Sequence, residues 1–359
     1  MAARRAAKAE AGLADLVVPV STEPMEARLV EALPQEEGWQ FEPKWDGFRC
    51  LSFRSGEEVE LRAKSGKSLT RYFPEVAAAL RVLPARRFVV DGEITIPRGE
   101  TLDFDALQMR LHPAETRIKK LARETPAVLI LFDLLLSPQG DCLMGAPLSR
   151  RRQALEAFFA ALPQGSLFRL SPFTASLREA RQWLDAAGGA LDGVVAKRRD
   201  GQYRPGERAM LKVKRQRTAD CVVGGFRYLS KTRKVGSLLL GLYDDAGKLS
   251  HVGFTATIAN DERDALTRRL EKLVAPPGFT GNAPGGPSRW SSSGRSAEWR
   301  PVRPELIVEV RYDQVTGERF RHGTRLMRFR PDKAPQQCRM EQLRREVRPR
   351  KLLSEVMER

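Results

Sequence analysis

The sequence predicts an α+β domain over its first two-thirds, followed by a smaller domain built mainly of β-strands. As far as Lys214 the chain mixes strand patterns with amphipathic helix patterns. After a polar segment at 215–220, which we interpret as a hinge, it shows several short strand patterns and one helix pattern. This combination is typical of a small β-barrel. A chain of 359 residues is long enough for two domains that each bury a core.

Four segments of the first domain have strand patterns. They are FVVDGEITI (88–96), AVLILFDLLL (127–136), GVVAK (193–197) and MLKVK (210–214). The first alternates, so that Asp91 and Glu93 share one face, and the last places Lys212 and Lys214 on one face. The run at 127–136 is apolar almost throughout, as in a strand that is buried on both sides. We therefore expect sheets that carry charged side chains on defined faces.

Helix patterns lie between these strands and in the second domain. RRQALEAFFAAL (151–162) carries an apolar stripe, and SLREARQWLDAA (176–187) begins with a capping box between Ser176 and Glu179. In the second domain the helix pattern is DERDALTRRLEKLV (261–274), and the strand patterns are CVVGGFRY (221–228), GSLLLGLYD (236–244), LSHVGFTA (249–256) and LIVEVRYD (306–313). The segment 276–299 is rich in Gly, Pro and Ser, which predicts a long surface loop around residue 285.

The balance of charge favours a polyanionic partner. The chain has 62 Lys and Arg against 45 Asp and Glu, a formal net charge of +17 at pH 7, and neutralising phosphates releases counterions. Residues 1–18 contain no signal-peptide core and are expected to be a flexible basic tail, and no apolar run approaches the length of a membrane span. The expected location is therefore the cytoplasm, in association with the nucleoid and not with a membrane.

The cysteines and histidines exclude several kinds of site. Four cysteines lie singly and far apart, without a CxxC pair, which argues against a structural zinc site and for a reducing compartment. Only three histidines occur, which disfavours a histidine base or a histidine-ligated metal. The chemistry should then come from lysines, arginines and carboxylates.

The stretch FEPKWDGFRC (41–50) places Lys44 between two acids, with Arg49 just beyond. An amine attacks only in its neutral form, which desolvation and neighbouring cations favour, and Arg49 and the lysines of 210–214 are candidate neighbours. Taken alone, the pattern K-x-D-G is short and also fits an ordinary turn with a solvated lysine.

The carboxylates of the strand at 88–96 extend this interpretation. Asp91 and Glu93 could hold a ribose hydroxyl or a hydrated Mg²⁺. A lysine amine, several phosphate-binding cations and a metal-binding acid together could attack the α-phosphorus of a nucleotide and hold the product as a lysyl-nucleotide.

In their order along the chain, the motifs resemble those of the covalent nucleotidyltransferases, and among them the ATP-dependent DNA ligases, from about residue 20 onward. They are EPKWDGFR (42–49), LRAKSGKSLTRYFPE (61–75), DGEI (91–94), LILFDLL (129–135), LDGVVAK (191–197), LKVK (211–214) and RLMRFRPDK (325–333). LDFDALQMRLHP (102–113) and RTADCVVGG (217–225) look most like the small bacterial ligases of type C. The resemblance implies an adenylation (nucleotidyltransferase) domain of antiparallel sheets with helices at 19–215, and an all-β OB-fold domain at 216–359.

The resemblance also implies a role for individual residues. Lys44 would be the residue adenylylated by ATP. The implied nucleotide-binding residues are Glu42 near the adenine edge, Arg49 at the ribose or phosphate, Lys64, Glu93 at the ribose, Phe132 against the adenine, Lys212 and Lys214 at the α-phosphate, and Arg330 and Lys333 at the leaving pyrophosphate. Glu93 and Asp192 would bind a divalent metal, Mg²⁺ or Mn²⁺. Lys64 stands where the family usually has Arg, and Asp192 where it has Glu.

As a whole, the resemblance implies an enzyme that seals nicks in duplex DNA, in repair, as a monomer and with a repair polymerase as a possible partner. AMP would pass from ATP to the lysine, then to the 5′-phosphate of the nick, and would leave when the 3′-hydroxyl attacks. An RNA ligase and a GTP-dependent capping guanylyltransferase share the lysine motif, and a noncatalytic OB-fold DNA-binding protein would share the charge. An NAD⁺-dependent ligase is less favoured, since no Cys-rich module is present.

Overall fold

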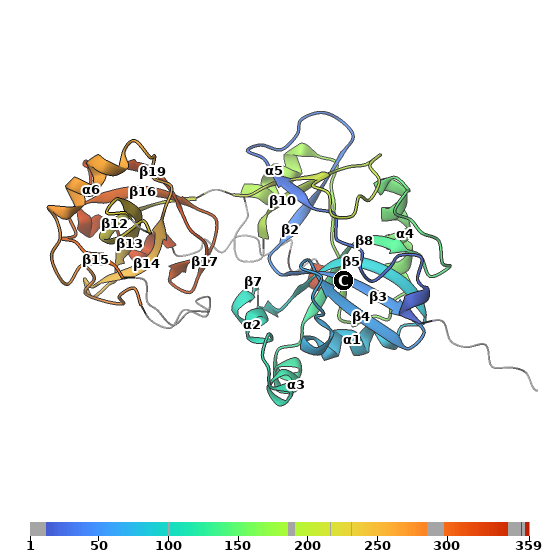
Figure 1. The fold of residues 1–359 in the computed structure, drawn as a ribbon. Coiled ribbons are helices and arrows are strands. Elements are labelled where there is room, and N and C mark those ends of the chain that lie inside the picture. Colours follow the sequence, from blue (N-terminus) through green and yellow to red (C-terminus); the bar gives the residue numbers. More distant parts are fainter. Residues whose placement is uncertain are drawn as a thin grey trace, which may run out of the picture. The chain divides into compact units, whose positions relative to one another are not determined.

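The computed structural model describes residues 12–99, 101–185, 191–215, 217–230, 232–285, 298–343, 353 and 356–358. The chain divides into two compact units (Figure 1): unit 1 comprises Met1–Arg215 with Val347–Arg359, and unit 2 comprises Gln216–Glu346. The sequence-based division assigns Val347–Arg359 to the second domain. In the structure this segment belongs to unit 1, because its described residues pack there.

Unit 1 contains two main sheets. The strands of the first are β1 (Ala27–Leu29), β2 (Trp39–Trp45), β10 (Leu191–Arg198) and β11 (Met210–Val213), in the order β1-β11-β10-β2. The strands of the second are β3 (Phe48–Ser55), β4 (Glu58–Ala63), β5 (Arg87–Thr95), β8 (Val128–Leu136) and β9 (Phe168–Leu170), in the order β4-β3-β5-β8-β9. Most neighbours are antiparallel, and only the edge pairs β1·β11 and β8·β9 are parallel among the described strands. The α+β prediction with antiparallel sheets is confirmed.

Helices and short elements complete unit 1. They are η1 (Leu13–Asp15), η2 (Thr70–Tyr72), α1 (Pro74–Arg81), the hairpin β6 (Pro97–Arg98) and β7 (Thr101–Leu102), α2 (Phe104–Met109), α3 (Glu115–Glu124), α4 (Leu148–Ala160) and α5 (Leu177–Asp185). Every residue of β8 is buried, as its apolar run predicts. The Oγ of Ser176 accepts a hydrogen bond from the backbone N–H of Glu179 at 3.3 Å, so α5 begins where the capping pattern predicts.

The beginning of the described chain differs from the predicted basic tail. Residues 1–11 lie outside the described part. Leu16 and Val18, however, are buried in a cluster that includes Phe53 and Leu135. The expectation of a flexible tail up to residue 18 is therefore wrong for these two positions. Their apolar side chains are buried in the core, which holds this part of the chain in place.

Unit 2 is a small β-barrel with one helix. Its elements are β12 (Arg217–Tyr228), β13 (Val235–Tyr243), β14 (Leu249–Thr255), α6 (Arg263–Glu271), β15 (Arg300–Pro301), β16 (Ile307–Tyr312), β17 (Val315–Thr316), β18 (Arg319–Phe320), β19 (Arg325–Phe329), η3 (Pro335–Gln337) and η4 (Met340–Leu343). The sheet order is β14-β13-β12-β16-β19, and a bridge between Thr255 and Thr324 joins its two edges. Closure of this kind removes the exposed strand edges of an open sheet.

One sequence-based expectation changes in unit 2. The polar segment 215–220 is not irregular throughout, because β12 begins at Arg217 and its first residues pair with β16. Pairing with β16 makes this segment a strand even though its residues are mostly polar. Of the predicted loop at 276–299, residues 286–297 lie outside the described part.

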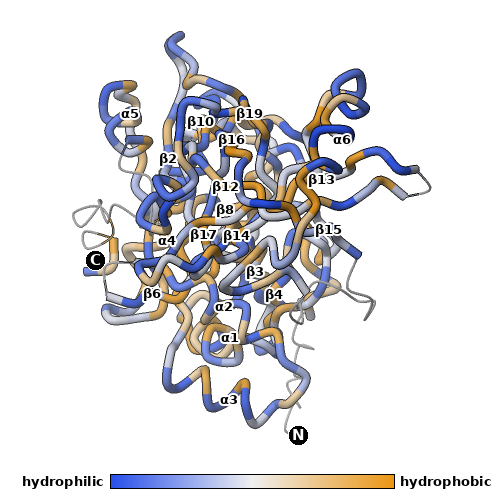
Figure 2. Tube along the Cα trace, turned by 90° about the vertical axis from the view of Figure 1, so that its left-hand side faces the viewer, coloured by the Kyte–Doolittle hydropathy of each residue, from blue (hydrophilic) through white to orange (hydrophobic). Residues whose placement is uncertain are grey.

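Figure 2 shows β13 coloured as hydrophobic along much of its length, in keeping with its central place in the barrel core.

Two glycines of the motifs are required by close approach of the backbone. A Cβ at Gly47 would lie 2.3 Å from the carbonyl oxygen of Ile94, so the turn from β2 to β3 can lie against β5 only with glycine there. Gly193 has φ +145°, and a Cβ there would lie 2.0 Å from the carbonyl oxygen of Val213. Glycine therefore lets the backbone after Lys44 pack closely against β5, and the backbone after Asp192 pack closely against the end of β11.

The described C-terminal residues pack beside the end of β2. Leu353 and Val356 are buried in one cluster with Trp45, Ile130, Leu102 and Leu191. The Nε of Arg169 also donates a hydrogen bond to the carbonyl oxygen of Met357 at 3.0 Å. This segment thus covers apolar side chains that adjoin Lys44 and Asp192 in sequence. None of the helices in the described part is long and apolar enough to cross a membrane.

Candidate active site

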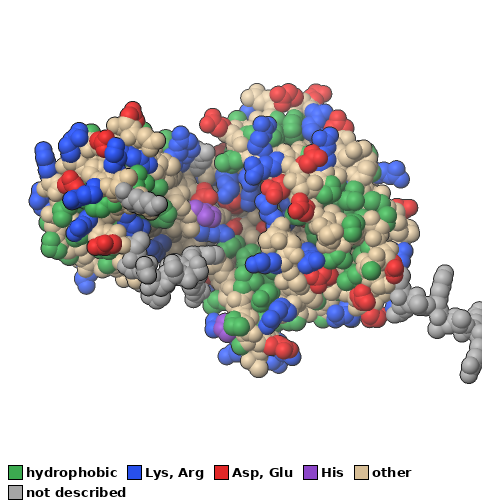
Figure 3. Space-filling view, viewed as in Figure 1, with side chains coloured by type: hydrophobic (Ala, Val, Ile, Leu, Met, Phe, Trp, Pro, Cys, Tyr) green, Lys and Arg blue, Asp and Glu red, His purple; other side chains and the backbone are tan. Residues whose placement is uncertain are grey.

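A pocket of about 230 Å³ in unit 1 collects most of the residues assigned from the motifs. Seven of them line it: Glu42, Lys44, Arg49, Lys64, Glu93, Phe132 and Lys212. The remaining lining residues are Pro24, Met25, Glu26, Ala27, Pro43, Trp45, Val195, Lys197 and Met210. The pocket thus brings together strands of both sheets and the segment that leads into β1. Figure 3 shows basic and acidic side chains intermixed on the visible face of each unit.

Lys44 lies on β2 and is held by an acid from the neighbouring strand. Its Nζ lies 2.6 Å from Oδ2 of Asp192, and the same oxygen lies 3.0 Å from Nζ of Lys214. The Lys44 side chain is 26% exposed, whereas that of Asp192 is 5% exposed. The register of β10 against β2 shifts between Leu191 and Gly193, and this bulge turns the Asp192 side chain toward Lys44.

The pKa of Lys212 reports a concentration of positive charge. Desolvation lowers this pKa, and the neighbouring Lys44, Lys214 and Lys64 lower it further. Two cations close together disfavour each other's charged form, which makes the site receptive to an anion. Lys44, Lys64 and Lys212 therefore form one cationic group in the pocket, with Lys214 adjoining it through Asp192.

Glu93 is an acidic residue that lines the pocket. Burial raises its pKa to about 7, although Lys44 and Arg49 act in the opposite direction. Within the described part of the chain, its carboxylate makes no hydrogen bond or ion pair. A carboxylate that faces a cationic pocket without such a partner is suited to a hydroxyl group or a hydrated divalent cation.

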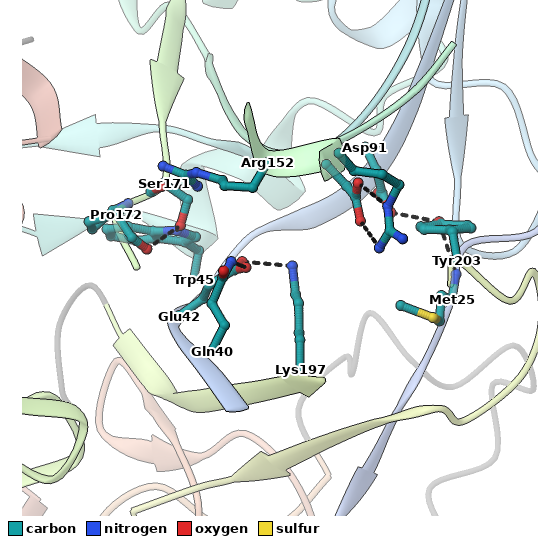
Figure 4. A network of polar contacts seen from close by, with 12 residues as sticks. Met25, Gln40, Glu42, Trp45, Asp91, Arg152, Ser171, Pro172, Lys197 and Tyr203 are labelled. Atoms are coloured by element: carbon teal, nitrogen blue, oxygen red, sulfur yellow. Dashed lines mark hydrogen bonds and ion pairs between the residues drawn. The ribbon is translucent and has the colours of Figure 1, made fainter. Parts of the chain in front are cut away.

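Arg49 is held rigidly by a buried acid. Its Nε and one Nη donate to the two oxygens of Asp91 at 2.6 and 2.5 Å, and a further hydrogen bond at 3.3 Å reaches the carbonyl oxygen of Met25. Tyr203 donates its hydroxyl to Asp91 at 2.7 Å and accepts from the backbone N–H of Met25 (Figure 4). Burial, followed by the charge of Asp91, raises the pKa of Tyr203, so this hydroxyl remains a donor. This network fixes the segment before β1 against the pocket.

Phe132 contacts two cations of the pocket. Arg49 lies 4.5 Å and Lys197 4.8 Å from the centre of its ring. Lys197 also donates to Glu42 at 2.7 Å, and Gln40 donates to the other oxygen of Glu42 at 2.9 Å (Figure 4). Glu42 is thus a buried, fully paired acid, and a base that stacks on Phe132 would share the ring with one of the two cations.

Lys64 pairs with an acid that the motifs do not include. Its Nζ lies 2.9 Å from Oε2 of Glu26, and Arg208 lies 3.7 Å from the same oxygen. The hydrogen bond from Lys64 lowers the pKa of Glu26. The lysine that stands where the family usually has Arg is therefore anchored by a carboxylate of the segment before β1.

Arg330 and Lys333 lie in unit 2 and share one acid. Nη1 of Arg330 is 3.0 Å from Oδ1 of Asp220, and Nζ of Lys333 is 2.5 Å from Oδ2. Arg330 is also paired with Asp332 at 2.8 Å, and this hydrogen bond lowers the pKa of Asp332 to about 2. Arg328, from the same motif, pairs with Glu309 at 2.6 Å.

Sequence reasoning missed Lys197, Tyr203 and Glu26. For Lys197 a signal existed, since strand alternation places it on the same face of β10 as the pocket-lining Val195. Tyr203 and Glu26 lie in irregular segments, where no periodicity predicts the direction of a side chain. No group of three or more His, Cys, Asp or Glu suited to a metal occurs among the described residues.

Comparison with known proteins gives a consistent result. The sequence matches the model of the ATP dependent DNA ligase domain over residues 19–214 and that of the ATP dependent DNA ligase C terminal region over 231–333. DNA ligase C2 of Mycolicibacterium smegmatis is 46% identical over 346 residues, which cover 92% of this chain and 96% of the relative. DNA ligase C of Mycobacterium tuberculosis is 43% identical over 343 residues, which cover 91% and 94%.

Among solved structures, a Lig E DNA ligase has a TM-score of 0.53 at 17% identity, covering 85% of this chain and 99% of its own, and this likeness concerns the fold alone. The two-sheet unit with a lysine in a cationic pocket, followed by a small barrel, defines the class of covalent nucleotidyltransferases. The matches narrow the class: the chain belongs to the ATP-dependent DNA ligase family, and the resemblance to its small bacterial C type is confirmed.

Proposed function

We propose that this protein seals nicks in duplex DNA, in DNA repair, through an AMP group carried by Lys44. The observation that supports this most is the position of Lys44. Its amine reaches a pocket lined by further lysines, and its acidic partner also holds Lys214. Such a site combines a nucleophile with groups that stabilise the charge of a phosphate in the transition state.

In the first step, Nζ of Lys44 would attack the α-phosphorus of ATP. The new P–N bond forms as the bond from the α-phosphorus to the bridging oxygen breaks, and pyrophosphate leaves with the negative charge. Lys212 and Lys214 are the residues proposed to hold the α-phosphate. Arg330 and Lys333 of unit 2 are the residues proposed to bind the leaving pyrophosphate.

Glu42, Lys197 and Phe132 form the part of the pocket proposed for the base. Glu42 is already paired with Lys197 and Gln40, so it would act by fixing Lys197 beside Phe132 as much as by contacting the base. Arg49, held on both oxygens of Asp91, presents a fixed cation to the ribose and phosphate.

A divalent metal fits Glu93 of this pocket, with Asp192 beside Lys44 as a second carboxylate. Mg²⁺ is commonly bound by one or two carboxylates together with substrate phosphates, and Glu93 is unpaired within the described part of the chain. Glu93 and Asp192 are the residues that would hold it. When bound, such an ion supplies positive charge to the phosphate oxygens.

DNA would be held mainly through its phosphates. The net charge of +17 favours contacts of this kind, which carry little sequence information and weaken steeply with salt. We therefore expect sealing to depend little on the sequence at the nick.

The test is labelling with α-³²P-ATP, followed by a chase with nicked duplex DNA. The wild-type protein should retain label in a denaturing gel and lose it as the nick is sealed. Lys44→Ala should retain the fold, measured by circular dichroism, and should take up no label. Label on Lys44→Ala protein would refute the assignment.

The same assay separates the alternatives. Label from GTP in place of ATP would indicate a capping-type guanylyltransferase, and sealing of nicked RNA in preference to DNA would indicate an RNA ligase. Absence of any adduct in the wild-type protein, with DNA binding retained, would indicate a noncatalytic DNA-binding protein.

A further inference from the structure

Asp220 holds two cations of unit 2 with its two oxygens. Oδ1 lies 3.0 Å from Nη1 of Arg330, and Oδ2 lies 2.5 Å from Nζ of Lys333. Asp220 is far from these residues in sequence, and it lies on β12, whereas Arg330 and Lys333 follow β19. One carboxylate thus fixes the separation of a guanidinium and an ammonium group that come from a turn after the strand.

Asp220 is itself firmly placed. On β12 it pairs with Glu309 of β16, and its neighbour Cys221 is fully buried in the barrel core. Its backbone N–H donates to Oε1 of Gln342 at 2.9 Å, and Nε2 of Gln342 donates to its carbonyl oxygen at 3.1 Å. The carboxylate therefore belongs to a rigid part of the barrel and not to a mobile loop.

The two cations differ from a buried structural pair in their access to solvent. The side chain of Asp220 is 11% exposed, whereas Arg330 is 15% and Lys333 is 30% exposed. Lysine has a flexible four-carbon stem, so an ammonium group held at one point loses less entropy when it binds an anion. The acid is thus covered, while Lys333, the more exposed of the two cations, can reach a ligand.

Asp332 contacts only one of these cations and offers a comparison. Its carboxylate pairs with Arg330 but no contact with Lys333 is recorded in the described part of the chain, and its side chain is 61% exposed. Asp332 thus orients Arg330 alone. The role of joining the two cations therefore falls on Asp220.

We propose that Asp220 is a positioning residue, which keeps Arg330 and Lys333 together as a preformed site for the pyrophosphate released when Lys44 is adenylylated. This inference rests on the proposed function. Two fixed cations bind a bridged diphosphate better than two independent ones, because the cost of ordering them has been met by folding. Asp220 makes no contact with the ligand in this role.

The decisive experiment compares two reactions of Asp220→Asn. Single-turnover labelling of Lys44 by ATP requires pyrophosphate to leave, whereas sealing of a nick that already carries 5′-AMP does not. We expect the labelling rate to fall about 10- to 100-fold, while sealing of the pre-adenylylated nick stays within about threefold of wild type. Asp264→Asn, which removes an exposed partner of Lys234 in unit 2, is the control and should label within about threefold of wild type.

A second readout addresses the pyrophosphate site itself. Labelled wild-type protein should release its label to added pyrophosphate, and Asp220→Asn should need about tenfold more pyrophosphate for half-maximal release. Asp220→Glu keeps the charge and should recover most of the labelling rate. If Asp220→Asn does not fold, judged by thermal unfolding, Gln342→Ala still tests the inference, because Gln342 holds the backbone of Asp220. This variant should weaken labelling more than sealing of the pre-adenylylated nick.

Equal losses in labelling and in sealing would show a merely structural role and would overturn the inference. So would wild-type labelling and pyrophosphate dependence in Asp220→Asn. Failure of the proposed function is distinguishable, because the wild-type protein would then take up no label at all.

Discussion

Asp192 of unit 1 and Asp220 of unit 2 each hold two cations, but in different ways. Asp192 offers one oxygen, Oδ2, to both Lys44 and Lys214. Asp220 gives one oxygen to Arg330 and the other to Lys333. The first arrangement leaves the second oxygen of Asp192 outside these ion pairs, whereas the second uses both oxygens of Asp220.

The backbone under each acid explains this difference. Asp192 lies at a β-bulge next to Gly193, so its side chain is turned toward β2 and β11 together. Asp220 lies in an unbroken antiparallel register with β16. A bulge can direct an acid into a pocket where a ligand acts, while a regular ladder fixes an acid that only orders its neighbours. Exchange of the acids by amides should therefore have unequal effects.

The largest expected effect is that of Asp192→Asn, which should reduce labelling of Lys44 by about 1000-fold. The change removes a proposed metal ligand and the charge that holds Lys44 and Lys214 in place. Single-turnover labelling with α-³²P-ATP measures it. Asp192→Glu, which restores the carboxylate, should remain within about tenfold of wild type. A loss no larger than that of Asp220→Asn would break the comparison.

A third acid–cation pair, Arg151 with Asp133, sharpens the comparison between Asp192 and Asp220, because both of its side chains are buried away from any ligand. Arg151 and Asp133 are both almost fully buried and joined by two hydrogen bonds of 2.8 and 3.0 Å. Arg151→Met should lower the free energy of unfolding by about 3–5 kcal/mol, because an uncompensated charge stays buried. Urea unfolding measures this.

The control for Arg151→Met is Arg98→Met, which removes an exposed partner of Asp103 and should cost less than about 1 kcal/mol. Folded Arg151→Met protein should label Lys44 at close to the wild-type rate. A large loss of labelling per folded molecule would show that this pair is not merely structural.

In unit 2, Arg319 contacts the neutral side chain of His251, and this contact should make the stability of the protein depend on pH. Nδ1 of His251 lies 2.9 Å from Arg319, and burial, followed by the charges of Arg319 and Arg227, lowers the pKa of His251 from 6.5 to about 3. Because the folded pKa lies below the unfolded one, the neutral imidazole contributes stability above pH 6.5. That contribution is lost as the pH falls from 6.5 toward 3.

Between pH 7 and pH 5 this loss should amount to about 2 kcal/mol. Urea unfolding at the two pH values measures it, and His251→Gln, which keeps a polar side chain but does not titrate, should show a smaller difference. An unchanged difference in His251→Gln would assign the pH dependence to other groups.

The smallest expected effect concerns Leu353 and Val356, whose apolar side chains pack against Trp45, next to Lys44. Leu353→Ala combined with Val356→Ala should lower the free energy of unfolding of unit 1 by about 1–2 kcal/mol. The value is below that of a central core site because a terminal segment can detach. Thermal unfolding measures it. Val82→Ala, at a position 78% exposed, is the control and should change little.

Much of the site could be predicted because its residues lie on strands with clear periodicity. Alternation places Lys212 on the face of β11 that lines the pocket, and the motif order brings in Lys44 and Glu93. The direction of Asp192 could not be predicted in this way, because a bulge reverses the alternation at that residue. Glu26 could not be predicted either, since it precedes a strand of three residues with no resolvable period.

By itself the sequence determined part of the secondary structure, such as strands β5, β8, β12 and β13 and helices α4, α5 and α6, together with the order of the motifs, because these follow from short-range periodicity. Only the tertiary structure decided which acid pairs with which cation: Asp192 with Lys44 and Lys214, and Asp220 with Arg330 and Lys333. Ion pairs between separate strands depend on register and bulges, and these are set by the packing of the whole sheet.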